Sequence, residues 1–325
     1  MKGKELTRQD IIDLLKLDDF TPIYEEADRI KCQQKGKEVL IRAIIEYSSY
    51  CQMRCQYCGI NGENRKAIRY RMSKDEILKA AFGAIDAGYR TIVLQGGEDP
   101  VFMTGEILED VICEIKAKDK DVAITLSAGE LSDEVLEKLK KAGANRFLLR
   151  HETADRELFA RIHPGKTLEE RVDRLRAIKS LGYETGSGFM VGIPGQSLES
   201  LADDLLLIKE LSCDMAGMGP YIAHPDTPLA GNPTGSVELT MRCVAIARLL
   251  LPNANLPVTT AIGVLDMDKR NSGFAKGANV VMRKVTPEKY KAAYQIYPAK
   301  PVKTDIKKER NELEEIIKSM DLIPV

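Results

Sequence analysis

The sequence has few cysteines, little net charge and no long apolar run, and each of these shortages excludes a class of protein. Seven cysteines in 325 residues are too few for a disulfide-dense scaffold, and the odd count favours reduced thiols. The 48 Lys and Arg nearly balance 49 Asp and Glu, which gives a formal net charge of -1. Neither a broad basic surface for nucleic acid nor a polybasic membrane anchor is therefore expected.

Membrane segments and targeting signals are also missing from the sequence. No run approaches the roughly 18 apolar residues of a membrane span, and the first ten residues lack the apolar centre of a signal peptide. We therefore expect a cytoplasmic protein whose partner is a small molecule, with no nucleic acid and no membrane. Hydrophobic residues make up 44% of the chain, which is enough to bury a globular core.

One local pattern recurs along the chain: an amphipathic stretch ends in a glycine, and an apolar, strand-like run follows. Glycine suits the left-handed position just after a helix because it has no Cβ. These joints are at Gly88, Gly143, Gly182 and Gly277. Residues 73–76 and 167–170 match the capping box that begins a helix. The chain therefore alternates between helices and short apolar strands.

The apolar runs predict about eight strands. They cover residues 39–47, 91–95, 122–127, 146–150, 183–191, 214–219, 256–261 and 278–282. Strands that alternate with helices indicate a parallel sheet buried on both faces. Eight such units favour a closed (β/α)8 barrel of the TIM type, although a partial barrel of six units stays open as an alternative. We expect one domain over 1–325, with a helical extension (1–36), the barrel (37–300) and a C-terminal helix (301–325).

Three of the cysteines lie within eight residues, directly after the first predicted strand. Cys51, Cys55 and Cys58 have the spacing Cys-x3-Cys-x2-Cys and would lie at the C-terminal mouth of a barrel, where active sites are found. Thiolates bind zinc or iron–sulfur clusters, and a structural zinc or an ordinary cluster uses four protein ligands. With no fourth cysteine or histidine nearby, a four-iron cluster would keep one iron open for a chelating ligand. A zinc knuckle or a chance group of buried thiols is the alternative.

This segment, including Tyr57 just before the third cysteine, resembles the signature of the radical S-adenosylmethionine (SAM) superfamily. The resemblance implies that the amino and carboxylate groups of SAM bind the open iron of a 4Fe-4S cluster. One electron from the cluster would then break the sulfonium bond and release methionine and a 5′-deoxyadenosyl radical. The protein would supply binding and orientation.

Further segments match the places where this superfamily binds SAM. Paired glycines at Gly96 and Gly97 let a ligand approach backbone carbonyls, and the resemblance implies that this segment holds the amino group of the methionine moiety. It also implies that Glu152 accepts from the ribose hydroxyls and that Arg171 pairs with the methionine carboxylate, while a loop at Ile193 backs the adenine ring. Read as structure alone, these are a βα turn, a surface arginine and a tight turn. The predicted cofactor-binding residues are Gly96, Gly97, Glu98, Ser127, Arg150, Glu152, Arg171 and Ile193.

Beyond the superfamily motif, the chain resembles the HydE family of FeFe-hydrogenase maturases. The matching segments are 69–73, 94–100, 148–153, 219–230, 259–263 and 294–298. The resemblance implies attack of the radical on sulfur in a small iron complex carrying cysteine, carbon monoxide and cyanide, with other hydrogenase maturation proteins as partners. It would place Met215 near the cofactor and further residues around an internal cavity. These are Thr259, Thr260, Met282, Tyr294 and Tyr297. For the two methionines, ordinary core packing is the alternative.

Two departures from the family pattern limit these expectations. No cysteine follows Cys243, so the second cluster that some family members carry near the C-terminus is not predicted. Gly96 stands where relatives can carry serine, which would remove a hydroxyl from the expected cofactor site. Other readings are a methylornithine synthase-like or biotin synthase-like radical SAM enzyme, or a non-catalytic iron–sulfur or zinc protein. His163 and His224 receive no role.

Overall fold

The computed structural model describes residues 5–298 and 305–325. The ends of the predicted segments at 1–36, 37–300 and 301–325 fall partly outside these ranges. Two helices precede the first strand, as the predicted extension requires: α1 (Arg8–Leu15) and α2 (Thr21–Lys35). Helix α1 begins at a capping box formed by Thr7 and Asp10.

Eight parallel strands form the barrel, in the order β7-β5-β4-β3-β2-β1-β10-β9. They are β1 (Glu38–Ser48), β2 (Thr91–Gly96), β3 (Ala123–Ser127), β4 (Arg146–Leu148), β5 (Glu184–Ser187), β7 (Met215–Ala216), β9 (Pro257–Val258) and β10 (Val280–Lys284). The two ends of this order meet at a parallel bridge between Met215 and Asn255, where the backbone nitrogen of Ala216 donates to the carbonyl of Asn255 at 3.2 Å. A single bridge thus closes the ring, and the eight-stranded prediction is confirmed.

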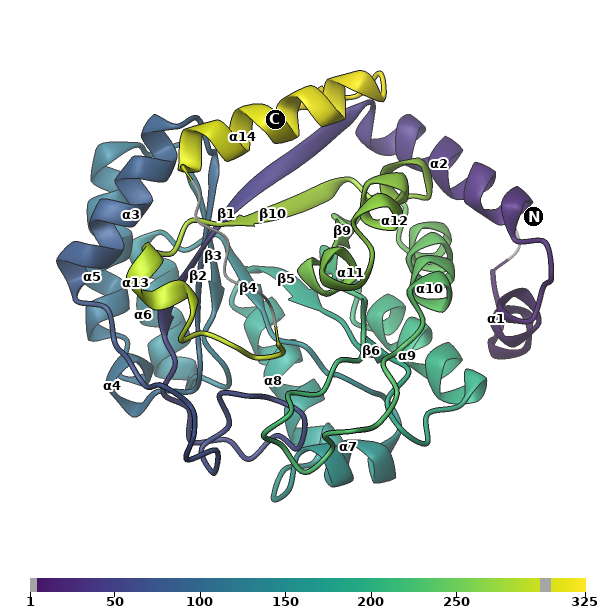
Figure 1. Ribbon diagram of the computed structural model, residues 1–325, viewed down its shortest axis with the longest axis horizontal. Coiled ribbons are helices and arrows are strands. Elements are labelled where there is room, and N and C mark those ends of the chain that lie inside the picture. Colours follow the sequence, from purple (N-terminus) through teal and green to yellow (C-terminus); the bar gives the residue numbers. More distant parts are fainter. Residues whose placement is uncertain (1–4, 299–304) are drawn as a thin grey trace.

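Helices pack around the strands and at the ends of the barrel (Figure 1). They are α3 (Lys74–Asp86), α4 (Pro100–Met103), α5 (Glu106–Lys118), α6 (Asp133–Ala142), α7 (Arg156–Ile162), α8 (Leu168–Ser180), α9 (Leu198–Glu210), α10 (Val237–Leu250), α11 (Thr260–Leu265), α12 (Met267–Ser272) and α13 (Glu288–Lys291), with a 3-10 turn, η1 (Gly273–Ala275). Within the described ranges, none of the helices has the length and apolarity that crossing a membrane requires.

The predicted local signals are confirmed at the helix ends. Capping boxes at Ser73 and Thr167 begin α3 and α8. The four joint glycines all have a positive φ, from 79° to 116°, a conformation in which any other residue would strain its Cβ. These glycines are Gly88, Gly143, Gly182 and Gly277.

Side chains along the strands alternate between the barrel interior and the helix layer. On β1, Arg42, Ile44 and Glu46 line the interior. The residues that alternate with them belong to the hydrophobic core shared with the helices: Ile41, Ala43, Ile45 and Tyr47. The two-residue period of a strand therefore decides which side chains can meet a ligand.

Two predicted strands are interrupted. The run 183–191 contains β5 and a separate β6 (Met190–Val191), divided at Gly188 with φ 156°. A Cβ at Gly188 would lie 2.0 Å from the carbonyl oxygen of Gly217. The two backbone segments therefore cross too closely for a side chain at this position. The run 214–219 likewise divides into β7 and β8 (Gly219–Pro220), and β6 pairs with β8 in a second, two-stranded sheet.

Two more runs end early: 146–150 at Leu148, and 256–261 at Val258, because α11 begins at Thr260. At the C-terminus, α14 (Ile306–Ser319) confirms the predicted helix, but a short strand, β11 (Ile323–Pro324), follows it unexpectedly and pairs with the start of β1. The nitrogen of Ile41 donates to the carbonyl of Val325 at 2.8 Å. Figure 1 shows α14 lying across the end of the barrel where β1 begins.

Adjacent isoleucines on α14 provide a matched test of this docking. Ile317 is completely buried, whereas Ile316 is 36% exposed. We expect Ile317→Ala to lower the free energy of unfolding by about 2–4 kcal/mol through lost packing. We expect Ile316→Ala to change it by less than about 1 kcal/mol. Urea unfolding followed by circular dichroism measures both, and equal effects would contradict the docked orientation of α14.

Candidate active site

A cavity of about 340 Å³ opens at the C-terminal ends of the strands. Nearly all the predicted site residues line it. They are Cys51, Cys55, Cys58, Gly96, Gly97, Glu98, Ser127, Arg150, Glu152, Arg171, Met215, Thr259, Thr260, Met282, Tyr294 and Tyr297. The fold thus brings segments from residue 51 to residue 297 together around one cavity.

The three cysteines lie on the loop after β1, and none of them forms a disulfide. Burial is the main cause that raises the pKa of each thiol, to about 12 for Cys58. Metal binding must therefore displace protons from these sulfurs. Within the described part of the chain, no three His, Cys, Asp or Glu side chains converge tightly enough to hold a single metal ion.

Arg69 holds the cysteine loop together from inside. Its guanidinium donates to four backbone carbonyls, including those of Ile60 at 2.7 Å and Asn61 at 2.6 Å. The other two acceptors are the carbonyls of Ser49 and Asn64. One planar cation thereby joins the beginning of the loop to its end, and this contact was not predicted.

Asp99 connects the same region to the glycine-rich turn after β2. Its fully buried carboxylate accepts two hydrogen bonds from Arg71, at 2.7 and 3.0 Å. It also accepts from the Ser48 hydroxyl at 2.6 Å. These partners hold the pKa of Asp99 below its usual value, although burial acts in the opposite direction. The Arg71 guanidinium lies 3.8 Å above the centre of the Tyr50 ring, next to the first cysteine.

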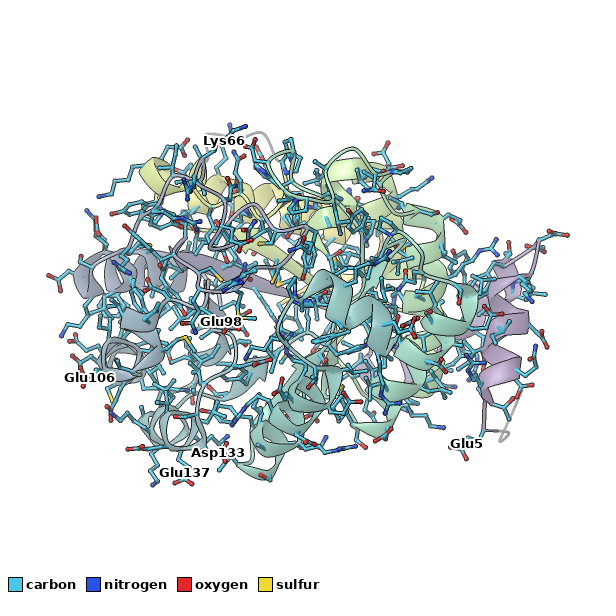
Figure 2. The ribbon with its side chains drawn as sticks, turned by 90° about the horizontal axis from the view of Figure 1, so that it is seen from below. Glu5, Lys66, Glu98, Glu106, Asp133 and Glu137 are labelled. Atoms are coloured by element: carbon cyan, nitrogen blue, oxygen red, sulfur yellow. The ribbon has the colours of Figure 1, made fainter. Side chains whose placement is uncertain are left out.

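The turn at Gly97 and Glu98 packs directly on the cysteine loop. A Cβ on Gly97 would lie 2.2 Å from the carbonyl oxygen of Tyr50. The backbone nitrogen of Gln52 donates to the carbonyl of Glu98 at 3.0 Å. The Glu98 side chain is only 8% exposed, and Figure 2 shows it inside the molecule, whereas Glu106 projects from the periphery. Burial, followed by the neighbouring Glu130, raises the pKa of Glu98.

Gly96 packs closely against the helix layer. A Cβ there would lie 2.4 Å from the Tyr47 ring, which is completely buried and packs on Phe102 with ring centres 4.5 Å apart. The missing side chain would therefore point into the helix layer, away from the cavity. Gly96 therefore contributes backbone to the cavity wall, and its contact with the cofactor stays a prediction.

Arg171 is held by a carboxylate that sequence reasoning missed. Its Nε donates to Glu130 at 2.6 Å, and Lys166 pairs with the other oxygen at 2.8 Å. Burial opposes ionisation of Glu130, but the two cations hold its pKa below the usual value. Arg171 is 5% exposed, so it is a buried cation with a fixed direction and not a surface arginine.

The charges after β4 face each other and the cavity, as expected. Arg150 and Glu152 form an ion pair of 3.1 Å. Glu152 has a φ of 65°, a conformation that costs energy for a residue with a side chain. Its backbone is fixed by hydrogen bonds of 3.0 Å to Gly188 and Met190. The preceding His151 is fully buried between Ser187 and Asp204.

Ile193 is the predicted cofactor residue that does not line the cavity. Its side chain is buried in a small apolar cluster with Met190 and Tyr221. Its backbone nitrogen and oxygen both pair with Gln196, at 3.3 and 2.8 Å, so the turn satisfies its own polar groups. Met190, three residues earlier, lies on the cavity wall in its place.

Deep in the barrel, Arg42 is a cation without a carboxylate partner among the described residues. Its Nη1 lies 3.1 Å from the Met215 sulfur, while Nε and Nη2 are buried without a hydrogen bond. Burial lowers the pKa of Arg42 to about 9, so it stays charged at neutral pH. The hydroxyls of Thr125 and Thr259 are also buried without partners in this part of the chain.

An ion pair that was not predicted also lines the cavity. Lys284 contacts Glu46 at 2.7 Å, and the Glu46 side chain is 2% exposed. The signal for Arg42 and Glu46 was present in the sequence, because both are charged residues at even positions of a strand that is otherwise apolar. A period-two reading of that strand would have placed them on the interior face.

Comparison with known proteins shows the family of the chain. A family model described as the radical SAM superfamily matches residues 45–208. The chain belongs to the radical SAM superfamily. It is 45% identical over 303 residues to the "[FeFe] hydrogenase maturase subunit HydE" of Thermotoga maritima, an alignment that covers 92% of this chain and 86% of that one. This similarity also places the chain in the HydE family.

Solved structures show the same radical SAM fold. A methylornithine synthase (PylB) superimposes with a TM-score of 0.83 at 23% identity, covering 100% of this chain and 95% of that chain. The FeFe-hydrogenase maturase HydG from Carboxydothermus hydrogenoformans superimposes with a TM-score of 0.86 at 19% identity, covering 99% and 76%. The barrel prediction is thus confirmed independently.

The residues present fit the cofactors that the radical SAM family implies, a 4Fe-4S cluster and SAM. Three thiols on one wall provide soft ligands for iron. Buried polar atoms without partners among the described residues, including the Arg150 Nε and the His163 Nε2, also line or border this cavity. Such groups are costly unless a ligand or water satisfies them.

The packing at Gly96 predicts a coupling with Tyr47. We expect Gly96→Ser to lower the free energy of unfolding by about 1–3 kcal/mol, because the new Cβ overlaps the tyrosine ring. Combining it with Tyr47→Leu should cost less than the sum of the two single changes. Gly83→Ser, at an exposed position with nothing within 4 Å of its Cβ, is the matched control. Additive effects in urea unfolding would contradict the overlap.

Proposed function

We propose that this radical SAM protein is a HydE-type maturase. It holds a 4Fe-4S cluster on Cys51, Cys55 and Cys58, cleaves SAM reductively, and acts on a sulfur-containing iron complex during FeFe-hydrogenase maturation. When bound, the cluster supplies the electron and SAM supplies the 5′-deoxyadenosyl radical. The observation that carries the proposal is one cavity that joins three thiols to a deep, partly unsatisfied polar interior.

Different side chains on the cavity wall are suited to different groups of SAM. Glu98 offers a buried carboxylate to the ammonium group, and Arg171, fixed by Glu130 at 2.6 Å, offers a cation to the methionine carboxylate. The backbone of Glu152 is fixed by hydrogen bonds to Gly188 and Met190, and we assign its carboxylate to the ribose hydroxyls, with Arg150 beside it at 3.1 Å. Because these groups are already ordered, binding SAM requires little rearrangement.

The interior supports an anionic, sulfur-containing substrate. Arg42 provides a positive charge with no carboxylate partner among the described residues, and the predicted cavity residues line the same cavity. Met215 and Met282 give a polarizable lining suited to sulfur. Carboxylate and cyanide ligands of an iron complex would satisfy donors that the protein leaves unpaired. The other hydrogenase maturation proteins would then be partners that supply the complex or receive it.

Cofactor cleavage is the first test. Anaerobically reconstituted protein, given dithionite and SAM, should release 5′-deoxyadenosine, measured by liquid chromatography. Cys55→Ala should abolish the release because the cluster loses a ligand. Cys113→Ala is the control, since this cysteine is exposed on α5, and it should change nothing. If the protein carries a full complement of cluster and releases no 5′-deoxyadenosine, the proposed cleavage of SAM is rejected.

Maturation of an apo-hydrogenase is the second test, with the other maturases present and HydE replaced by this protein. We expect activation, and we expect Arg42→Met to reduce it by about tenfold or more, because a hydrogen bond to a charged group is worth about 1.5–3 kcal/mol. The variant should still cleave SAM, and its free energy of unfolding should be unchanged or higher, because an unpaired buried charge is removed.

Arg90→Met, at an exposed position paired with Asp119 at 3.0 Å, is the control for the loss of an arginine and should leave maturation unchanged. Failure of the unmodified protein to activate the hydrogenase, with SAM cleavage intact, would reject the maturase role. The chain would then be another radical SAM enzyme, of which methylornithine synthase is one known type.

A further inference from the structure

His163 lies against the middle cysteine of the predicted cluster loop. Its Nδ1 is 3.4 Å from the Sγ of Cys55. The backbones of the two segments are tied beside this contact, because the nitrogen of Gln56 donates to the carbonyl of Ile162 at 3.0 Å. A main-chain hydrogen bond between the adjacent residues therefore fixes which side chain faces Cys55.

The imidazole ring has little freedom to turn away. It is 3% exposed and packs on Phe159, with ring centres 4.7 Å apart and an interplanar angle of 31°. Tyr57 meets it edge-on at 5.7 Å. The nitrogen of His163 also donates to the carbonyl of Phe159 at 2.8 Å, so both the backbone and the ring are fixed at the end of α7.

The three cysteines differ in the donors around their sulfurs. Burial raises the pKa of Cys51 and of Cys58, while nearby backbone amides act in the opposite direction. Beside the sulfur of Cys55 there is a histidine ring. A thiolate bound to iron has no proton to give and can only accept a hydrogen bond. The nitrogen that faces it must then carry the proton, which leaves the Nε2 as the unprotonated nitrogen of a neutral ring.

We propose that His163 is a positioning residue that donates a hydrogen bond from Nδ1 to the cluster-bound Sγ of Cys55 and thereby raises the reduction potential of the cluster. This inference rests on the proposed cluster at the three cysteines. Reduction adds one negative charge to the cluster and its thiolates, so a hydrogen bond to a ligating sulfur stabilises the reduced state more than the oxidised state.

Redox titration of the reconstituted cluster without SAM, followed by electron paramagnetic resonance, tests the proposal. His163→Phe keeps an aromatic ring between Phe159 and Tyr57 but removes the donor. We expect the ratio of reduced to oxidised cluster at a fixed potential to fall by between about threefold and tenfold, where tenfold corresponds to ~59 mV for one electron. His163→Asn, whose amide can donate from nearly the same place, should restore at least half of the shift.

His224→Asn is the matched control. His224 lies in the same region and its Nδ1 accepts from the backbone nitrogen of Asp226 at 3.1 Å, a contact that asparagine can reproduce. The cluster potential of this variant should match that of the unmodified protein. An unchanged potential in His163→Phe at full iron content, or equal shifts in His163→Phe and His163→Asn, would overturn the proposal.

A second measurement uses the unmodified protein and does not depend on the stability of a variant. The chain contains three histidines, so uniform labelling with 15N-histidine introduces few labelled rings. Pulsed electron paramagnetic resonance of the reduced cluster should detect a weak 15N coupling transmitted through the hydrogen bond. No coupling from a loaded cluster would reject the role of His163. Failure of the protein to bind any cluster would instead reject the proposed function, so the two failures can be told apart.

Discussion

The arrangement of the site depends on the hydrogen bonds that the buried carboxylate of Asp99 accepts. It is fully buried, and it accepts from Arg71 and from the Ser48 hydroxyl at the end of β1. It follows the turn at Gly97 and Glu98 directly in the chain. Because a buried charge must keep its partners, the turn after β2 cannot move relative to the cysteine loop after β1. The loop that carries the three sulfurs and the cavity wall at Gly97 and Glu98 are thereby held together.

Charge is distributed unequally between the mouth of the cavity and its interior. At the mouth, cations and carboxylates are paired, as in the contacts of Arg171 with Glu130 and of Arg150 with Glu152. In the interior, Arg42 is buried with no carboxylate beside it among the described residues. Paired charges fix the direction of a side chain, whereas an unpaired buried charge is a cost that a bound anion can offset. The charged side chains at the mouth thus already orient one another, whereas the interior charge is available to a bound anion.

Prediction from the sequence succeeded where the cause is local. The cysteine spacing, the joint glycines such as Gly143 and the capping box at Thr167 each depend on a few consecutive residues. It failed where the partner is distant in the sequence. Nothing near Arg171 indicates Glu130, which comes from the loop after β3, and nothing near Gly96 indicates that the Tyr47 ring fills the space beside it. At Ile193 the structure adds a local contact, because the backbone of this turn pairs with Gln196, and the predicted contact with the cofactor stays a prediction.

The sequence by itself determined that three thiols follow a strand in a chain of alternating strands and helices, and it identified the radical SAM signature. Those features follow from residue type, spacing and the periods of helices and strands. Only the tertiary structure decided which side chains meet. Closing the ring brings Met215 of β7 against Arg42 of β1, and packing α7 on the cysteine loop brings His163 to Cys55. Contacts between residues more than a hundred positions apart are set by how the barrel closes, and no local pattern in the chain specifies them.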